Sequence, residues 1–212
     1  NGSMNRTIKL LMIADVFTVT GFGLVDPILG IYIKENLVGG TIFAAGFASM
    51  LFLVTKCLVQ LPFSRYVDRH DHKVRWLWRG SALVALVPFL YLIATDIKVF
   101  YVASIIMGIG SGLVYPTWLG LFSTHLDRKH ESFEWSLYST MTGLGTAASA
   151  AVGAGIAQFF GFQLTFVFVS ILSLIGVGIL FTLEKKKESR HKIPLDHYHR
   201  KRKCTDGYCR NI

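Results

Sequence analysis

The chain has 212 residues, of which 52% are hydrophobic and 17% are charged, and its mean hydropathy is +0.46. A soluble globular domain carries more charge and fewer apolar residues, so this composition excludes a soluble domain and predicts an integral membrane protein. The formal net charge is +9, but residues 184–212 contribute ten Lys/Arg and four Asp/Glu, so most of the excess belongs to one terminal segment and does not indicate nucleic-acid binding.

Six apolar runs follow one another along the chain, separated by short polar breaks. Each is long enough for a membrane-spanning helix, which needs about 20 mostly apolar residues. The runs cover residues 8–33, 41–63, 74–95, 99–124, 133–160 and 162–183. We therefore predict an all-α membrane protein with one transmembrane domain over residues 4–184. Residues 1–3, which precede the first methionine, are predicted to be a cloning scar, and residues 185–212 a basic, disordered cytoplasmic tail.

Lysine and arginine residues gather in the breaks on one side of this topology. Arg65, Arg69, Lys73 and Arg75 surround the second break, and the basic tail follows the last run. Cytoplasmic loops are enriched in such residues, so both termini are predicted to be cytoplasmic. The basic tail is also expected to contact anionic lipid headgroups.

The pattern Gly-x-Gly-Leu-Val-x-Pro occurs at residues 21–27 and again at residues 110–116, which is an internal repeat. In the two copies, Gly23 and Gly112 stand four residues before Pro27 and Pro116. A proline in a helix removes the hydrogen bond to the carbonyl four residues earlier, and glycine tolerates the resulting distortion. We predict a helix bend, and a gate, at each copy; the alternative is two unrelated kinks.

Charged groups inside a membrane span cost about 2.5 to 3.5 kcal/mol each on insertion scales, so each needs a reason. Asp26 lies beside the first repeat proline, and its counterpart in the second copy is Tyr115. We predict that Asp26 binds substrate or a proton, with Tyr115 and Trp118 supplying hydrogen bonds and stacking. The alternative is a carboxylate satisfied by backbone groups at the bend.

Asp15 and Lys56 are each seven residues from the predicted inner ends of the first two spans, so we expect them to share a depth and form a buried charge pair. The alternative is that Lys56 extends to the cytoplasmic surface. No cluster of catalytic or metal-ligating residues falls at one depth, and no phosphate-binding glycine loop occurs, so we predict no enzyme activity, no cofactor and no metal. His197, His199, Cys204 and Cys209 in the tail match no metal-site template.

Residues 64–73, after the second run, resemble the signature loop of the major facilitator superfamily, Gly-x-x-x-Asp-Arg-x-Gly-Arg-Arg. Asp68, Arg69 and Lys73 match this motif, whereas positions 64, 71 and 72 depart from it. The small-residue stretch 143–155 is similar to the fifth helix of the family. A full transporter of the family has twelve helices in two halves, so the chain is identified as a half-length member.

The resemblance implies that the six spans form two inverted three-helix repeats, with the first and fourth helices lining a cavity. One half lacks the opposite wall of a pathway, so we expect a homodimer that forms a twelve-helix, alternating-access carrier for an unidentified small solute or ion. A heteromeric partner, or a non-transporting scaffold or receptor subunit, are the alternatives. Ser104 stands where the family often has Arg, which argues against proton antiport. Residues 132–137 are similar to short bacterial relatives, which implies a bacterial inner membrane.

In the family, the signature loop docks against the start of the fifth helix of the other half, where an aspartate meets the positive end of the helix dipole. In a homodimer this implies an intersubunit latch between Glu134 and Arg65 or Arg69, in the same loop as Asp68 and Lys73. The alternative is that these basic residues only anchor the loop to the cytoplasmic surface.

Overall fold

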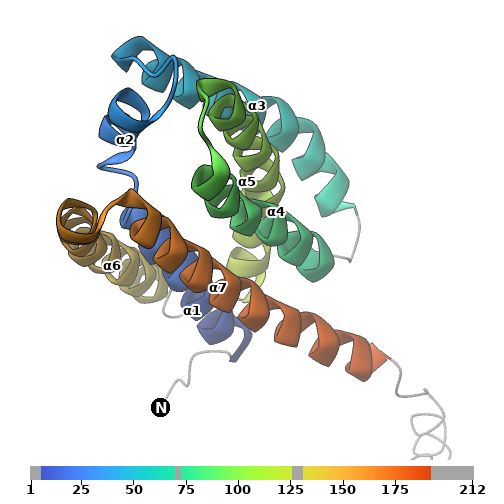
Figure 1. The fold of residues 1–212 in the computed structure, drawn as a ribbon. Coiled ribbons are helices and arrows are strands. Elements are labelled where there is room, and N and C mark those ends of the chain that lie inside the picture. Colours follow the sequence, from blue (N-terminus) through green and yellow to red (C-terminus); the bar gives the residue numbers. More distant parts are fainter. Residues whose placement is uncertain (1–5, 70–72, 126–130, 192–212) are drawn as a thin grey trace, which may run out of the picture.

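The computed structural model describes residues 6–69, 73–125 and 131–191, and these residues are almost entirely helical (Figure 1). The helices are α1 (Arg6–Gly23), α2 (Leu29–Asn36), α3 (Ile42–Asp68), α4 (Lys73–Ile93), α5 (Ile97–His125), α6 (Glu131–Phe160) and α7 (Phe162–His191). The predicted all-α membrane fold is confirmed. Five of these helices, α3 to α7, are long and apolar enough to cross a membrane.

The first predicted run is divided between two helices, whereas each of the other five runs forms one. Helix α1 ends at Gly23, and α2 begins at Leu29. At the other end, α7 continues to His191, seven residues into the segment predicted to be a disordered tail. Those residues are mostly Lys and Glu, which favour a helix. The predicted cloning scar and residues 192–212, with their four His and Cys candidates, lie outside the described residues.

The helices pack in a pattern that occurs twice, in the same chain order. Helix α3 packs along α5 as α6 packs along α1; α4 packs on α5 as α7 packs on α1; and α4 and α7 pack on each other. Exchanging α1 with α5, α3 with α6 and α4 with α7 therefore reproduces the main contacts of the bundle. The predicted arrangement of two inverted three-helix repeats is confirmed. Figure 1 shows α3 and α6 on opposite flanks of the molecule.

The second glycine of each repeat copy lies at an equivalent helix crossing. A Cβ atom at Gly112 would lie 2.9 Å from Cβ of Val59 and 3.0 Å from the carbonyl oxygen of Lys56, both on α3. A Cβ atom at Gly23 would collide with the hydroxyl of Ser149 on α6. Helices α3 and α6 occupy equivalent places in the two three-helix repeats. Gly112 therefore lets α5 approach α3 closely, and Gly23 lets α1 approach α6 in the same way.

The first glycine of each copy faces the other exchanged pair of helices. A Cβ atom at Gly110 would lie 2.8 Å from Cγ2 of Val84 on α4, and one at Gly21 would lie 3.2 Å from Cβ of Leu172 on α7. The sequence repeat therefore marks four helix crossings, two on each central helix. This packing role accounts for both glycines of the motif, including the one that does not precede the proline by four residues.

The two copies differ in their backbone. In the first copy, residues 24–28 form turns between α1 and α2, and the break packs against α6. Gly153 on α6 makes this possible, because a Cβ atom there would collide with the carbonyl group of Leu24. In the second copy, α5 continues through Pro116, and the following turns carry Trp118 and Phe122 into a buried cluster. Tertiary packing, rather than the shared motif, decides where the helix stops.

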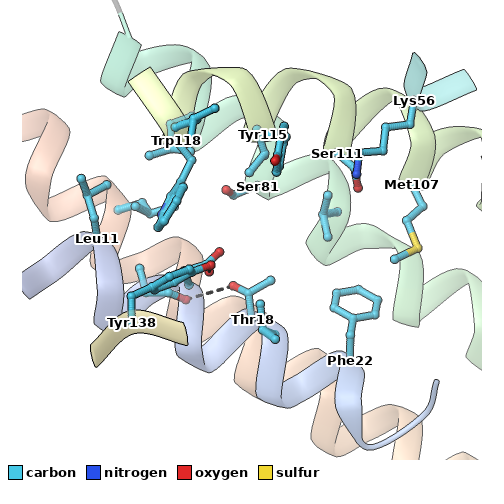
Figure 2. Close-up of a pocket in the computed structure, with 18 of the residues that line it drawn as sticks. Leu11, Thr18, Phe22, Lys56, Ser81, Met107, Ser111, Tyr115, Trp118 and Tyr138 are labelled. Atoms are coloured by element: carbon cyan, nitrogen blue, oxygen red, sulfur yellow. Dashed lines mark hydrogen bonds between the residues drawn. The ribbon is translucent and has the colours of Figure 1, made fainter. Parts of the chain in front are cut away.

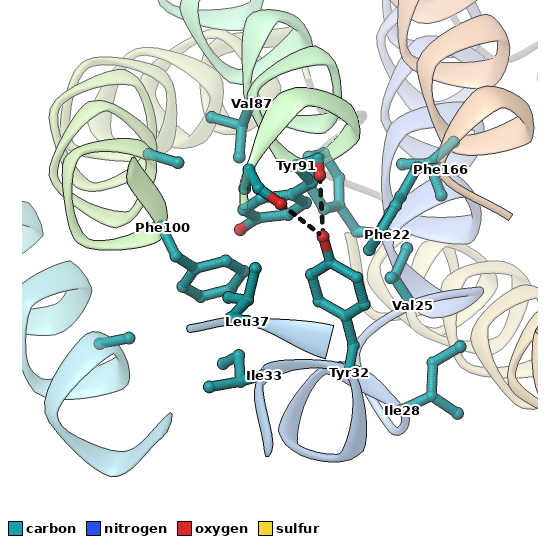
Figure 3. Close-up of a cluster of buried hydrophobic side chains, with 14 of the residues drawn as sticks. Phe22, Val25, Ile28, Tyr32, Ile33, Leu37, Val87, Tyr91, Phe100 and Phe166 are labelled. Atoms are coloured by element: carbon teal, nitrogen blue, oxygen red, sulfur yellow. Dashed lines mark hydrogen bonds between the residues drawn. The ribbon is translucent and has the colours of Figure 1, made fainter. Parts of the chain in front are cut away.

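A buried cluster closes the bundle around the α1–α2 break (Figure 3). Its centre is Tyr32 of α2, whose ring packs edge-on against Phe166 of α7 at 4.8 Å between centroids. The Tyr32 hydroxyl donates to the carbonyl oxygens of Tyr91 at 3.1 Å and Ala94 at 3.3 Å, at the end of α4. The Tyr91 carbonyl also accepts from the backbone N–H of Ala94 at 3.4 Å, so the Tyr32 hydroxyl adds to the capping of this helix end and fixes α2 against α4.

Candidate functional site

A cavity of about 450 Å³ lies between α1, α6 and α7 on one side and α3, α4 and α5 on the other (Figure 2). The inverted repeat exchanges these two groups of helices, so the cavity lies at the interface of the repeats, where carriers of this architecture place their binding sites. Most of its surface is apolar. Its polar lining residues are Asp15, Thr18, Asp26, Lys56, Ser81, Ser111, Tyr115, Trp118, Tyr138 and Thr146.

Pairs of repeat-related positions face each other across this cavity. Positions 18, 22 and 26 in and after α1 correspond to positions 107, 111 and 115 of α5, and all six line the cavity. The spacing of four residues places positions 107, 111 and 115 on one face of α5, and positions 18 and 22 on one face of α1. The side chains in each pair differ: Thr18 corresponds to Met107, and Phe22 to Ser111. The backbone repeat is therefore retained, while the chemistry of the two walls is not.

The structure brings the three predicted binding residues, Asp26, Tyr115 and Trp118, to this one cavity. Asp26 is exposed and lies in the turns that connect α1 to α2. Tyr115 is 48% exposed and Trp118 is 7% exposed. The indole N–H of Trp118 is buried and has no hydrogen-bond partner among the described residues. A buried donor without a partner is costly, so a ligand that supplies an acceptor would gain from binding there.

Three aromatic side chains, Trp118, Trp135 and Tyr138, line one end of the cavity, and the buried Phe122 packs behind Trp118. The ring of Trp118 stacks on Phe122 of the same helix at 4.7 Å, with an interplanar angle of 13°. Across the helix interface it meets Tyr138 of α6 at 4.7 Å and Trp135 of α6 at 6.2 Å. Tyr138 and Trp135 line the cavity together with Trp118. This group, which we call the aromatic box, presents ring faces and edges to any bound molecule.

The expected ion pair between Asp15 and Lys56 is not formed in the described part of the chain. Asp15 instead accepts a hydrogen bond of 2.6 Å from the hydroxyl of Tyr138, and the ammonium of Lys56 lies 5.0 Å from the ring centroid of Tyr115. Both charged residues line the cavity. The cavity separates them, and each is paired with a neutral aromatic side chain.

The four predicted bend residues have unequal surroundings. Gly23 ends α1 and Pro27 lies in the turns that follow, whereas Gly112 and Pro116 both lie inside α5. All four lie within three residues of a cavity-lining residue, because Asp26 and Tyr115 directly precede the two prolines and line the cavity. Any gating by these residues therefore acts on the walls that carry the predicted binding groups.

The signature loop joins α3 to α4 and is described on either side of residues 70–72. Asp68 Oδ1 lies 4.0 Å from Nζ of Lys73, and Asp68 is 74% exposed, so this contact contributes little to stability. Arg65 and Arg69 are exposed on the end of α3. Glu134, in contrast, is buried at 4% exposure within one chain. The latch would need this carboxylate to be reachable from the second copy, and it stays a prediction.

Sequence reasoning missed several cavity residues, of which Tyr138, Trp135 and Ser111 are the most polar or polarizable. The cavity position of Ser111 could have been predicted from the sequence, because Ser111 lies four residues before Tyr115 on the same helix face. Tyr138 and Trp135 carry no such signal. They belong to the first turns of α6, and only the packing of α6 against α1 brings them to the cavity.

Residues 11–205 match the family model of the Major Facilitator Superfamily, and the chain belongs to this family. The chain is similar to the proton-coupled antiporter flippase LtaA of Staphylococcus saprophyticus, with 24% identity over 62% of this chain and 35% of that protein. It is also similar to a Na(+), Li(+), K(+)/H(+) antiporter of Planococcus maritimus, with 23% identity over 85% of this chain and 43% of the relative.

Solved structures agree with this assignment of the fold. The POT family transporter PepTSo superposes with a TM-score of 0.73 at 14% sequence identity, covering 85% of this chain and 37% of that one. The chain therefore spans about half the length, or less, of the relatives that it matches. Family and fold together define an integral membrane protein with the architecture of one transporter half.

Proposed function

We propose that this chain is one half of a secondary-active transporter, and that two copies assemble into a twelve-helix, alternating-access carrier for a small solute. The observation that carries the proposal is the cavity between α1 and α5, which repeat-related positions line from both sides. A cavity at the interface of inverted repeats is the feature that alternating access needs, because relative motion of the repeats opens it to either face of the membrane.

The flanks of the molecule support a second half. Helices α3 and α6 bury only 11% of their most apolar windows inside the chain, compared with 33% to 44% for α4, α5 and α7. The exposed side chains include Phe43 and Leu58 on α3 and Leu144 and Phe159 on α6. Small residues of α6 between positions 143 and 155 permit close helix packing in a membrane. A twofold axis along the membrane normal would bury both flanks at once.

Within this carrier, Asp26, Tyr115 and Trp118 bind the solute or a coupling ion, and both termini face the cytoplasm of a bacterial cell. The signature loop would dock Asp68 and Arg69 near the first turn of α6 in the second copy. Since Glu134 is buried, the exposed Glu131 is the carboxylate available for a latch there. A contact of this kind would stabilise one of the two access states.

The mass of the assembly in lipid nanodiscs tests the homodimer. We expect two copies per particle at working concentrations, measured by native mass spectrometry or mass photometry with the nanodisc mass subtracted. Particles that contain one copy, at every lipid composition that keeps the protein folded, would exclude the homodimer and leave a different partner as the source of the second half.

Cysteine accessibility separates a carrier from a non-transporting scaffold. In a background with Cys57, Cys204 and Cys209 changed to serine, Ser111→Cys places a thiol on the cavity wall. A carrier that alternates exposes this thiol to a membrane-impermeant maleimide from both sides of oriented vesicles. If Ser111→Cys is labelled from one side only, as the surface control Ile93→Cys is, the result would support a scaffold.

A further inference from the structure

The two charged groups on opposite walls of the cavity identify the class of solute. Asp15 on α1 is held by the Tyr138 hydroxyl at 2.6 Å, and Lys56 on α3 lies over the Tyr115 ring at 5.0 Å. Neither partner carries an opposite charge. Figure 2 shows Lys56 and Tyr138 on opposite sides of the cavity, with Tyr115 on the same wall as Lys56.

Charges in a site of low dielectric are costly unless they are paired with an opposite charge. Asp15 and Lys56 are too far apart to form an ion pair with each other in the described chain. Asp26, the third charged lining residue, lies in the exposed turns after α1. Asp15 and Lys56 are therefore the two charged groups on the helical walls of the cavity that a ligand would have to neutralise, and Asp26 in the exposed turns remains available to a coupling ion.

The side chains around each charge indicate which ligand group fits there. Beside Asp15 lies the aromatic box, with Tyr138 and Trp118 at 4.7 Å between ring centroids. A carboxylate with aromatic faces next to it suits an ammonium group, which gains from both ion pairing and cation–π contact. On the other wall, Lys56 and Ser111 both line the cavity. A wall that carries an ammonium and a hydroxyl suits a carboxylate or another small acidic group.

We propose that the cavity binds a zwitterionic solute with an apolar or aromatic body, its ammonium group at Asp15 and its acidic group at Lys56. Such a molecule pairs both charges at once and adds no net charge to the site. Its acidic group pairs with the Lys56 ammonium in place of the Tyr115 ring, and its body lies against the aromatic box. A ligand with one charge would leave either Asp15 or Lys56 without a counter-charge. This proposal rests on the proposed carrier function, because it names the solute class for the same cavity.

A matched set of four small molecules tests the proposal directly. 4-(Aminomethyl)benzoate carries both charges across a ring, and L-phenylalanine carries both on one carbon. 4-Methylbenzylamine and 4-methylbenzoate have the shape of the first compound but only one charge each. Binding is measured by isothermal titration calorimetry on the full chain in nanodiscs. We expect at least one zwitterion to bind tenfold or more tightly than both single-charge analogues. Equal affinity for a single-charge analogue, or no binding by either zwitterion, would overturn the proposal.

Two variants assign the ends of the ligand. Lys56→Gln is expected to remove the preference for the zwitterion over 4-methylbenzylamine, and Asp15→Asn the preference over 4-methylbenzoate. Lys34→Gln, at an exposed lysine of α2, is the matched control and should leave all affinities within twofold. Tyr138→Phe, which keeps the ring but removes the bond to Asp15, should retain the charge selectivity. If Lys56→Gln and Asp15→Asn fold like the original chain and keep the full preference for the zwitterion, the assignment is wrong.

These readouts do not depend on the oligomeric state or on transport. A chain that fails the nanodisc mass test but binds zwitterions selectively retains the site and loses the homodimer. A chain that is dimeric and labels from both sides at position 111, but shows no charge selectivity, retains the carrier and loses the solute class.

Discussion

Replacing Gly112 with alanine tests whether the repeat glycines are packing residues. The new Cβ atom would lie 2.9 Å from Cβ of Val59 and 3.0 Å from the carbonyl oxygen of Lys56. Carbon atoms in contact prefer about 3.5 to 4.0 Å, so α3 must move away by roughly half an ångström or more. Overpacking of this kind costs about 1 to 3 kcal/mol, while alanine regains about 1 kcal/mol of helix propensity over glycine. We expect a net loss of up to about 2 kcal/mol.

Gly178→Ala is the matched control, because Gly178 lies inside α7 and has open space around its Cα. There the same substitution brings only the gain in helix propensity, so it should stabilise the chain by up to about 1 kcal/mol. The free energy of unfolding is measured for both variants by steric trapping in bicelles. If Gly112→Ala is as stable as Gly178→Ala, the close approach of α3 and α5 is not what this glycine provides.

Three further changes test contacts of single side chains. Tyr32→Phe removes the bonds to the carbonyls of Tyr91 and Ala94. It should lower the free energy of unfolding by about 1 to 2 kcal/mol, since hydrogen bonds in membranes are worth about that much or less. An unchanged free energy of unfolding would show that these bonds do not fix α2. Thr41→Ala removes the cap of α3, in which the hydroxyl accepts from a backbone N–H at 3.0 Å, and should cost about 0.5 to 2 kcal/mol in the same assay, whereas Thr41→Ser should keep the original stability. Tyr138→Phe leaves the Asp15 carboxylate in the cavity without its donor and should destabilise the empty protein by about 1 to 3 kcal/mol; a smaller loss for Tyr138→Phe than for Tyr32→Phe would argue against a buried Asp15.

Much of the fold was accessible from the sequence, because the bilayer fixes the length and apolarity of a spanning helix. The six apolar runs correspond to the observed helices, with one run divided in two. The motif could not predict that division. The same seven-residue pattern gives turns after Gly23 and an unbroken helix through Pro116, because Gly153 of α6 makes room for one break and Trp118 is held in a cluster that keeps the other segment helical.

Part of the candidate site could also be predicted from the sequence. Asp26 and Tyr115 are found together by repeat symmetry, and Trp118 follows on the same helix. The partners of Asp15 and Lys56 depend on contacts between helices that are far apart in sequence. The depth argument placed both charges in one region, but it assumed that opposite charges at one depth meet. The two residues form no ion pair with each other; the Tyr138 hydroxyl is the partner of Asp15, and the Tyr115 ring is the partner of Lys56.

The broken first repeat and the unbroken second repeat also bear on how such a carrier would change direction. In the proposed carrier, one route to the opposite access state is for the two inverted repeats to exchange their conformations. In this chain the exchange would require α1 to become continuous across residues 24–28 while α5 opens near Pro116. The two events would differ in energy, because one releases a turn seated on Gly153 and the other disturbs the contacts of Trp118 with Trp135 and Tyr138 of α6. If the chain works as the proposed carrier, helix packing would bias it between inward and outward states before any solute or ion gradient acts.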